Sequence, residues 1–402
     1  MTYKEVKRTK ERVVSVYDGT LGIQRYGVDN LYPQEMIKFI ESSGTGGVCL
    51  ERYATFIEGN GFNDEAFSEF VCNRKGETTD DILRLVANDC AKYNGFALHV
   101  NYNALCEIVS LNHVPFECCR LGEENEDGTI TYIVYHPDWT GNKTRKGKKI
   151  QVSKDNTIPY YQFNPNKAVV LAQIESAGGI EQYKGQILWV SLAGKNRYPK
   201  PIYDKVLTNL STDEGLDNVK YRNVRNNFLP SGMLIRRKGS NLTIDANGNK
   251  VDEDEIRRQM EENSKTLEVF MGDENTGSMM EVTLQDGESA PEWKPIENDT
   301  FDKKFEKTTA DIAQRIYSAF GQEPWYSLRV GKTGFSGEVL ADAYDYYNSF
   351  VSTQRRFIQR SFKHIFTNWA FNANPSMDFS IEPLVFIRQK WANLNQPVNQ
   401  YE

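Results

Sequence analysis

The chain has 402 residues, of which 39% are hydrophobic and 26% are charged, and its 48 Lys and Arg against 55 Asp and Glu give a net charge of −7. This length predicts roughly two or three structural units with a sizeable core, and the composition excludes a disordered chain. The acidic balance argues against a protein held mainly by nonspecific attraction to phosphates. No run approaches the roughly 18 apolar residues of a membrane span, and the N-terminus lacks an apolar signal region, so we expect a soluble protein made in a cytoplasm.

The six cysteines are scattered without a C-x-x-C pair. This pattern favours reduced, buried thiols over a disulfide framework. His99, Cys106, His113 and Cys118 are conceivable zinc ligands, but their spacing matches no compact zinc motif. We therefore expect no metal and no cofactor.

The N-terminal half predicts mixed α/β structure. A first helix is expected after Leu31, and the glycines at 44, 46 and 47 indicate a turn between helices. A second helix is predicted over Thr79–Tyr93, because Ile82, Leu83, Val86 and Cys90 share one face. From Phe96 to about Val190 the pattern changes to strands that indicate a large sheet, at residues 97–100, 130–135 and 187–190.

Beyond Pro199 the pattern is helical as far as Pro230. Residues 231–297 then predict a small α/β insert, with a strand at Met233–Arg236, a turn at Asn247-Gly248, a helix from Asp252 to about Ser264, and strands at 267–271 and 281–284.

A further helix is predicted from about Asn298 to Phe320, followed by a turn-rich segment from Gly321 to Gly337. The strongest periodicity comes next. Apolar residues from Val339 to Trp369 predict one helix of more than 30 residues, with acidic side chains at its start and basic side chains at its end. A short strand is expected at Phe379–Ile381.

Few segments resemble a chemical site. Gly331-Lys332-Thr333 is similar to the end of a phosphate-binding P-loop, but Tyr326 stands where the first glycine belongs and a helix, not a strand, precedes it. Five basic residues within 143–149 could contact nucleic acid, although a solvated hairpin tip is the favoured interpretation. The four histidines assemble no Ser-His-Asp or Cys-His constellation, so we expect no enzyme.

Three passages in order resemble the portal proteins of tailed bacteriophages. Residues 26–33 (YGVDNLYP), with 40–43 and 56–62, are similar to the opening of a portal wing. Residues 222–234 (RNVRNNFLPSGML) are similar to the passage from stem helix into clip. Residues 312–324 (IAQRIYSAFGQEP) resemble the family's alanine-rich helix that ends in Phe, Gly and Pro. Together they extend the likeness over most of residues 20–385.

The resemblance implies an α+β, portal-like fold with a mixed α/β wing, a helical stem, a small α/β clip insert and a long C-terminal wing helix. The implied order is wing 1–198, stem helix 199–229, clip 230–297, second stem helix 298–320, tunnel loop 321–337, and long wing helix with closing strand 338–385. Residues 386–402 then form a tail, so a helical crown is expected to be absent or vestigial.

The resemblance also implies function. Such a protein forms a ring at one capsid vertex, usually of twelve subunits, through which DNA is packaged and ejected. The implied partners are further copies of the chain, the terminase large subunit, the major capsid protein, head-tail adaptor or neck proteins, and the double-stranded DNA in the channel, with no membrane. The implied location is the virion, after assembly in the host cytoplasm.

The candidate site residues follow from this assignment. In the tunnel loop they are Arg329, Gly331, Lys332, Thr333 and Gly334, and in the clip, as the docking surface for the motor, they are Arg236, Arg237, Lys238, Asn247 and Gly248. Two other hypotheses stay open. One is a nucleotide-binding packaging or replication enzyme that uses Gly331-Lys332-Thr333, and the other is a head structural protein without an axial channel.

Overall fold

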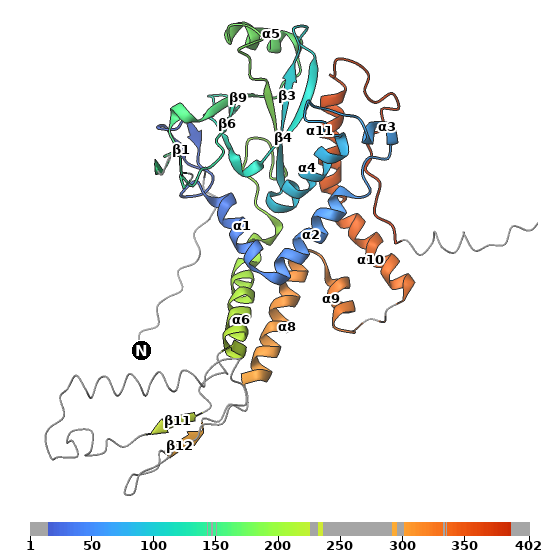
Figure 1. The fold of residues 1–402 in the computed structure, drawn as a ribbon. Coiled ribbons are helices and arrows are strands. Elements are labelled where there is room, and N and C mark those ends of the chain that lie inside the picture. Colours follow the sequence, from blue (N-terminus) through green and yellow to red (C-terminus); the bar gives the residue numbers. More distant parts are fainter. Residues whose placement is uncertain are drawn as a thin grey trace, which may run out of the picture. The chain divides into compact units, whose positions relative to one another are not determined.

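Figure 1 shows the fold in the computed structural model, which describes residues 15–142, 144–145, 148–149, 151–225, 232–235, 292–295, 301–332, 334 and 336–386. By its internal contacts the chain divides into two compact units, residues 1–210 with 314–402, and residues 211–313. No helix in the described ranges has the length and apolar character needed to cross a membrane. The expected α+β class is confirmed.

A six-stranded sheet forms the centre of the first unit. Its strands are β3 (Gly95–Tyr102), β4 (Ile108–Val114), β5 (Cys119–Leu121), β6 (Tyr132–Tyr135), β9 (Ile158–Gln162) and β10 (Gln186–Ser191). They lie in the order β4-β3-β10-β9-β6-β5, and all neighbours are antiparallel except β9 and β10. The predicted large sheet is therefore confirmed, with β3, β6 and β10 overlapping the three predicted strands.

One helix within the sheet region was not predicted. The helix α5 (Lys167–Ser176) connects β9 to β10. Because parallel neighbours need a crossover connection, the sheet order accounts for this helix. Its apolar residues form a continuous run, Ala168-Val-Val-Leu-Ala172, so no one-sided stripe marks it in the sequence.

In Figure 1, α3, α4 and α11 lie beside the strands of the sheet, and four further helices of the first unit lie below them. They are α1 (Tyr32–Ser42), α2 (Gly44–Glu58), α3 (Glu65–Ser68), α4 (Thr79–Tyr93), α9 (Glu323–Arg329), α10 (Gly337–Phe350) and α11 (Ser352–Phe366). Two small hairpins complete the first unit, β1 (Tyr17–Asp18) with β2 (Ile23–Gln24), and β7 (Thr144–Arg145) with β8 (Lys148–Lys149). Short 3-10 turns occur at Phe116–Cys118, Lys154–Asn156 and Ile202–Val206.

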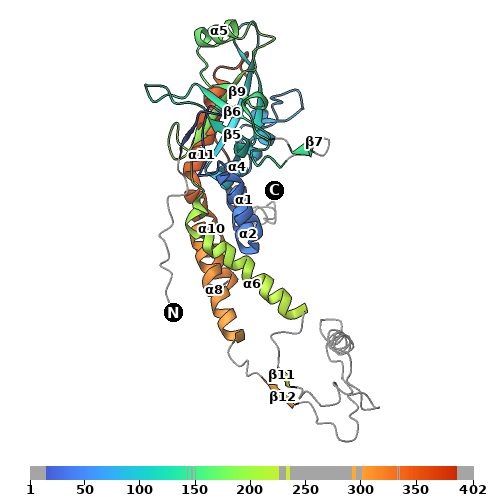
Figure 2. The ribbon, with the colours of Figure 1, turned by 90° about the vertical axis from the view of Figure 1, so that its left-hand side faces the viewer.

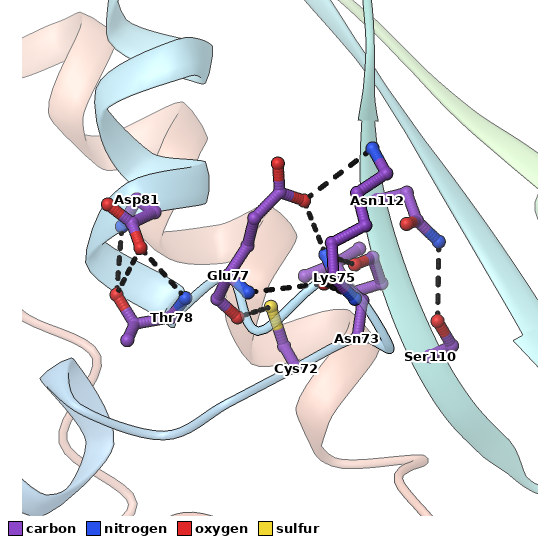
Figure 3. Close-up of polar contacts among 9 residues, drawn as sticks. Cys72, Asn73, Lys75, Glu77, Thr78, Asp81, Ser110 and Asn112 are labelled. Carbon is purple, nitrogen blue, oxygen red and sulfur yellow. Dashed lines mark hydrogen bonds and ion pairs between the residues drawn. The ribbon is translucent and has the colours of Figure 1, made fainter.

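The helix α4 has the predicted bounds because its ends are capped by side chains. Thr78 and Asp81 form a capping box: the Thr78 hydroxyl accepts from the Asp81 amide at 3.1 Å, and the Asp81 carboxylate accepts from the Thr78 amide at 3.1 Å (Figure 3). The hydrogen bonds that the Asp81 carboxylate accepts from the Thr78 amide and hydroxyl hold the pKa of Asp81 below its ordinary value. At the other end, Asn94 takes the left-handed conformation with φ of 62° and closes the helix.

The glycines at 44, 46 and 47 do not form a turn between helices, and that prediction was wrong. They form the first turn of α2, whose N-cap is Ser43. Gly46 lies where α2 meets other apolar side chains, and a Cβ there would lie 2.5 Å from Leu210 and 3.0 Å from Ile40. Close packing, and not a bend, therefore explains the glycine at 46.

The predicted single helix of more than 30 residues is two helices, α10 and α11. They meet at Val351, a fully buried residue with φ of −85° and ψ of 0°, where ψ departs from the regular α-helical value of about −42°. The two helices pack on different partners. The Tyr347 ring of α10 contacts Phe56 at 4.8 Å between centroids, whereas the Phe362 ring of α11 contacts Phe62 at 4.9 Å. The bend lets each apolar face meet its own partner.

The predicted closing strand at Phe379–Ile381 is reduced to a single bridge. Ile381 pairs antiparallel with Phe62, and the Glu382 amide donates to the Gly61 carbonyl at 2.9 Å. Gly59 stands so close that a Cβ would lie 2.2 Å from the Glu382 carbonyl oxygen, and its φ is +67°. The C-terminal segment therefore depends on a glycine at 59.

The second unit is entered through α6 (Leu207–Arg225) and left through α8 (Phe301–Ala319), both of which cross the boundaries of that unit (Figure 2). Within it, β11 (Gly232–Ile235) pairs antiparallel with β12 (Glu292–Pro295). The predicted strand at Met233–Arg236 overlaps β11. The predicted turn, helix and strands between 247 and 284 lie outside the described residues.

All six cysteines are buried and none forms a disulfide, as predicted. Within the described ranges, no three of the His, Cys, Asp and Glu side chains gather into a cluster that could hold a metal ion. His113 instead pairs with Asp89 at 2.7 Å, and His99 contacts the Lys184 carbonyl at 2.7 Å.

A completely buried arginine joins the N-terminal segment to the sheet. All five N–H groups of Arg120 are used: Nε donates to the Asn30 side chain at 2.6 Å, Nη1 to the Glu117 and Cys119 carbonyls at 2.8 Å, and Nη2 to the Asn30 carbonyl at 2.7 Å and to Gln34 at 3.3 Å. Burial lowers the pKa of Arg120. Among the described residues no carboxylate pairs with this cation, so neutral oxygens alone replace its hydration.

Two aromatic rings contact the Arg120 guanidinium. Its central carbon lies 4.8 Å from the Trp139 ring and 5.7 Å from the Tyr26 ring. Tyr26 also stacks on Tyr198 at 4.0 Å, and its amide donates to the Asn30 side chain at 3.0 Å. Two residues of the passage 26–33, which carries part of the family resemblance, therefore contact this arginine directly: Tyr26 and Asn30.

We expect Arg120→Lys to lower the free energy of unfolding by about 3 kcal/mol, because an ammonium offers three donors from one point and cannot replace a planar five-donor fork. Arg25→Lys is the matched control. Arg25 is half-exposed and pairs with Asp18, so its change should cost about 0.5 kcal/mol or less. Chemical denaturation of both variants measures the difference, and equal losses would contradict this account of Arg120.

Candidate functional site

The segment 321–337, predicted as a turn-rich loop, contains a short helix. It begins at the buried Gly321 and Gln322, continues through α9, and reaches exposed residues from Arg329 onward. The segment therefore has a fixed root and an exposed turn. The two parts have different chemistry.

The side chain of Gln322 fixes the root. It is fully buried, and its Nε2 donates to the Cys49 carbonyl and to the Tyr347 hydroxyl, both at 2.7 Å. Its Oε1 accepts from Arg52 Nη1 at 2.9 Å. The amide therefore has a partner for each donor and for its acceptor, and it joins α2, α9 and α10.

Aromatic rings surround this amide. The hydroxyl of Tyr347 passes the hydrogen bond on to the Phe320 carbonyl at 3.0 Å, and its ring stacks on Phe350 at 5.4 Å. Trp325 of α9 contacts Tyr347 at 5.0 Å and lies under the Arg52 cation at 5.5 Å. Burial raises the pKa of Tyr347, so its hydroxyl stays protonated as a donor.

Gly331 ends α9 in a Schellman motif. Its φ is +69°, its amide donates to the Leu328 carbonyl at 3.2 Å, and the Lys332 amide donates to the Ser327 carbonyl at 3.0 Å. The glycine was predicted to give the loop freedom to move. Its observed role is a helix cap, which needs the left-handed conformation but also fixes the turn.

Four of the five predicted tunnel-loop residues lie in described positions. Arg329, Gly331, Lys332 and Gly334 are all exposed, and Arg329 donates to the Tyr317 hydroxyl at 3.4 Å. Thr333 lies outside the described residues. The structure thus brings two cations to one capped, solvent-facing turn.

The five predicted clip residues, Arg236, Arg237, Lys238, Asn247 and Gly248, lie outside the described residues. The neighbouring β11–β12 pair joins residue 235 to residue 292, so the segment between these residues begins and ends at one place.

The turn around Gly331 lacks the surroundings of a P-loop. A P-loop places its glycines between a strand and the N-terminal end of a helix, where amides and the positive end of the helix dipole face phosphate. Here Gly331 follows the C-terminal end of α9, where carbonyls and the negative end of the dipole lie. This geometry does not favour nucleotide binding.

The sequence did not indicate the residues that hold the root. Gln322 belongs to the passage 312–324 that carries the family resemblance, but no local pattern marks a glutamine as buried. Arg52 and Cys49 were not recognised because no helix was predicted over the residues of α2, between the glycines at 44–47 and Thr79.

No family model matches the sequence, and comparison with curated proteins finds no match. Solved structures that match the fold include three at 14% identity each. One is from the virion of a native gene transfer agent particle, with a TM-score of 0.44 and coverage of 92% of this chain and 91% of that one. A second is from the neck of an empty gene transfer agent particle computed with C6 symmetry, with a TM-score of 0.47 and coverage of 92% of this chain and 92% of that one. A third is from the neck of a native particle computed with C12 symmetry, with a TM-score of 0.46 and coverage of 90% of this chain and 89% of that one.

We expect Gln322→Ala to lower the free energy of unfolding by about 3 kcal/mol, because the Arg52 guanidinium, the Cys49 carbonyl and the Tyr347 hydroxyl each lose a buried partner. Gln182→Ala on the surface is the control and should change stability by about 0.5 kcal/mol or less. Denaturant titration of both variants is the measurement. A loss in the Gln322 variant no larger than in the control would show that the root is held by other contacts.

Two glycines with nearly equal φ allow packing to be separated from backbone strain. A Cβ at Gly331 meets nothing within 4 Å, whereas a Cβ at Gly321, with φ of +65°, would lie 2.6 Å from the Phe350 ring. We expect Gly331→Ala to lower the free energy of unfolding by about 1 kcal/mol, from backbone strain alone. Gly321→Ala should lower it by about 2 kcal/mol more, because the new Cβ also clashes with the Phe350 ring. Thermal or chemical unfolding of the pair tests this, and equal costs would argue against a tight Gly321–Phe350 contact.

Proposed function

We propose that this chain is a portal subunit. In this proposal it forms a ring at one capsid vertex, serves as the conduit for DNA packaging and ejection, and provides a docking site for a terminase and for neck or tail proteins. The protein has no enzymatic activity of its own. The observation that carries the proposal is the agreement between the order of the resembling passages and the path of the chain.

That path supports a stem and a clip. The chain leaves the mixed unit through α6 and returns through α8, and the pairing of β11 with β12 lies between them. Two helices that flank an insert closed at its base match the implied stem helices 199–229 and 298–320 around a clip at 230–297. The residues proposed to meet the motor, from Arg236 to Gly248, belong to that insert.

Exposed apolar side chains on α6 support assembly into a ring. Tyr221 is 61% exposed and Val219 is 40% exposed. Covering large exposed apolar side chains with another protein surface lowers the free energy, because it removes them from water. Packing of α6 against another copy of the chain would supply that cover.

The segment 321–337 supports a contact with passing DNA. Its root is fixed by Gln322 and its exposed turn carries Arg329 and Lys332. In a channel, these cations would touch phosphates transiently, and the contacts must be weak because a ring of strong ones would stop the DNA. A fixed root with a cationic tip suits this task.

Imaging of purified protein tests the proposal directly. Negatively stained particles should be rings with a central hole, of about twelve subunits, and labelled ATP should not bind. Compact particles without a hole would favour a head structural protein without a channel, and saturable ATP binding would favour the nucleotide-binding alternative.

We expect Lys332→Glu to leave ring assembly intact while slowing DNA packaging or letting DNA leak back, because a carboxylate on the exposed turn repels phosphate. Lys332→Arg is the matched control, since it keeps the charge. Packaging and retention are measured with procapsids assembled from each variant. Normal DNA filling and retention in the Lys332→Glu variant would show that this turn does not contact the passing DNA.

A further inference from the structure

One line of charged side chains follows the exposed faces of α10 and α11, and we call it the charged stripe. Figure 1 shows the two helices following one another in the first unit. Helical hydrogen bonds continue on both sides of the bend: the Val351 amide donates to the Tyr347 carbonyl at 3.0 Å, and the Arg355 amide to the Val351 carbonyl at 3.2 Å. Residues three and four positions apart therefore keep to one face across the bend. The stripe consists of the exposed Glu338, Asp342, Asp345, Ser349, Ser352, Arg356, Arg360 and Lys363.

The signs of charge are separated along this stripe, with the acidic residues on α10 and the basic residues on α11. Like charges one helical turn apart destabilise a helix, and they occur at Glu338 with Asp342 and at Arg356 with Arg360. The helix dipoles favour only Glu338, in the first turn of α10, and Lys363, in the last turn of α11. Among the described residues, none of the six charged side chains forms an ion pair. Contacts within the described part of the subunit therefore do not account for the separation.

The order of the charges makes the stripe complementary to a second copy that runs antiparallel. The two serines form its centre, and each acidic residue has a basic counterpart nearly equally far on the other side of that centre. A two-fold axis through the centre would place every acidic residue opposite its counterpart on the other copy, and each pair would occur twice. The pairs are Asp345 with Arg356, Asp342 with Arg360, and Glu338 with Lys363.

Aromatic side chains beside the stripe fit the same arrangement. Tyr346 of α10 is 49% exposed, and Phe357 of α11 is partly exposed. They are separated by close to three whole turns of helix, so they lie on the same flank of the stripe. In an antiparallel pair, Tyr346 of one copy would lie beside Phe357 of the other. Tyr346 also borders a groove lined by Pro324 and Val339, so apolar surface adjoins the charges.

We propose that free subunits pair antiparallel through the charged stripe, across a two-fold axis that passes between Ser349 and Ser352. The partner is a second copy of this chain, selected by charge complementarity. The contact is isologous, because both copies use the same surface. Neighbours in a ring of about twelve are related by rotation about the ring axis and meet through two different surfaces. The pair is therefore a separate assembly of the free chain, which goes beyond the proposed ring and does not rest on it.

The pair should be weak and sensitive to salt. Exposed ion pairs contribute little individually, and salt screens them over about 8 Å at physiological ionic strength. We expect a dissociation constant on the order of 10 μM at low salt, and at least about tenfold weaker pairing at high salt. Such a pair is a reversible store of free subunits.

Cysteine cross-linking tests the antiparallel order. Glu338→Cys and Lys363→Cys should each stay unlinked alone under mild oxidation, because the pair holds the two copies of either position roughly 37 Å apart, at about 1.5 Å per residue. An equimolar mixture of the two variants should form a disulfide-linked dimer. A mixture of Glu338→Cys with Glu126→Cys, an exposed residue outside the stripe, is the control and should stay unlinked. The six natural cysteines are buried, so their contribution should be small.

Charge reversal tests the complementarity. Variant A carries Glu338→Lys, Asp342→Lys and Asp345→Lys, and variant B carries Arg356→Glu, Arg360→Glu and Lys363→Glu. The control variant carries Glu123→Lys, Glu124→Lys and Glu126→Lys, which are exposed residues outside the stripe. Sedimentation velocity separates pairs from rings and measures the dissociation constant of the pair.

We expect A alone and B alone to pair at least about tenfold more weakly than wild type at low salt. An equimolar mixture of A and B should pair again, because opposite charges then meet at every position. Three reversals change the net charge of A and of the control alike, from −7 by +6 to −1. General repulsion predicts easier pairing of both, whereas the proposed contact predicts loss in A alone.

Three results would overturn the inference. Linking of Glu338→Cys with itself as fast as with Lys363→Cys would exclude an antiparallel order. Pairing of A as tight as that of wild type would show that the stripe charges do not meet. Weaker DNA binding by B with unchanged pairing would assign the basic half of the stripe to nucleic acid. Negatively stained images report rings separately, so the pair can fail while the proposed ring stands.

Discussion

The buried amide of Gln322 is the contact on which the arrangement of the C-terminal helices depends. It accepts from Arg52 of α2, donates to the Cys49 carbonyl of the same helix, and donates to Tyr347 of α10. A buried amide is costly unless its hydrogen bonds are made, so the three segments keep one relative position. The exposed turn at Arg329–Lys332 then starts from a fixed point.

Arg120 and Gln322 both meet the requirement that a buried polar side chain have hydrogen-bond partners. Each is a fully buried polar side chain, and each is satisfied mainly by carbonyls and neutral side chains, not by an ion pair. Directional hydrogen bonds specify geometry more strictly than apolar contacts do. The first unit thereby has two rigid anchors, at Arg120 and at Gln322.

The roles of glycine differ among positions that look alike in the sequence. Gly331 caps a helix, Gly46 admits Leu210 against α2, and Gly59 admits the Glu382 carbonyl. The interpretation of glycine as a sign of turns or mobility therefore missed α2 and overstated the freedom of the loop. The reason is that backbone conformation and close approach both favour glycine, and only the surrounding atoms tell which of them applies.

Local signals by themselves determined α4, the main strands and the existence of helices before and after the insert. Each of these signals involves only a few neighbouring residues: a capping box, the alternation of apolar and polar residues in a strand, and the apolar stripe along one face of a helix. The order of those elements with the family-like passages also gave the portal hypothesis. Tertiary structure alone decided the bend at Val351 and the partners of Arg120 and Gln322. These features join residues such as Cys49 and Gln322 that are far apart in the chain, and no local pattern records which distant oxygen a buried donor will meet.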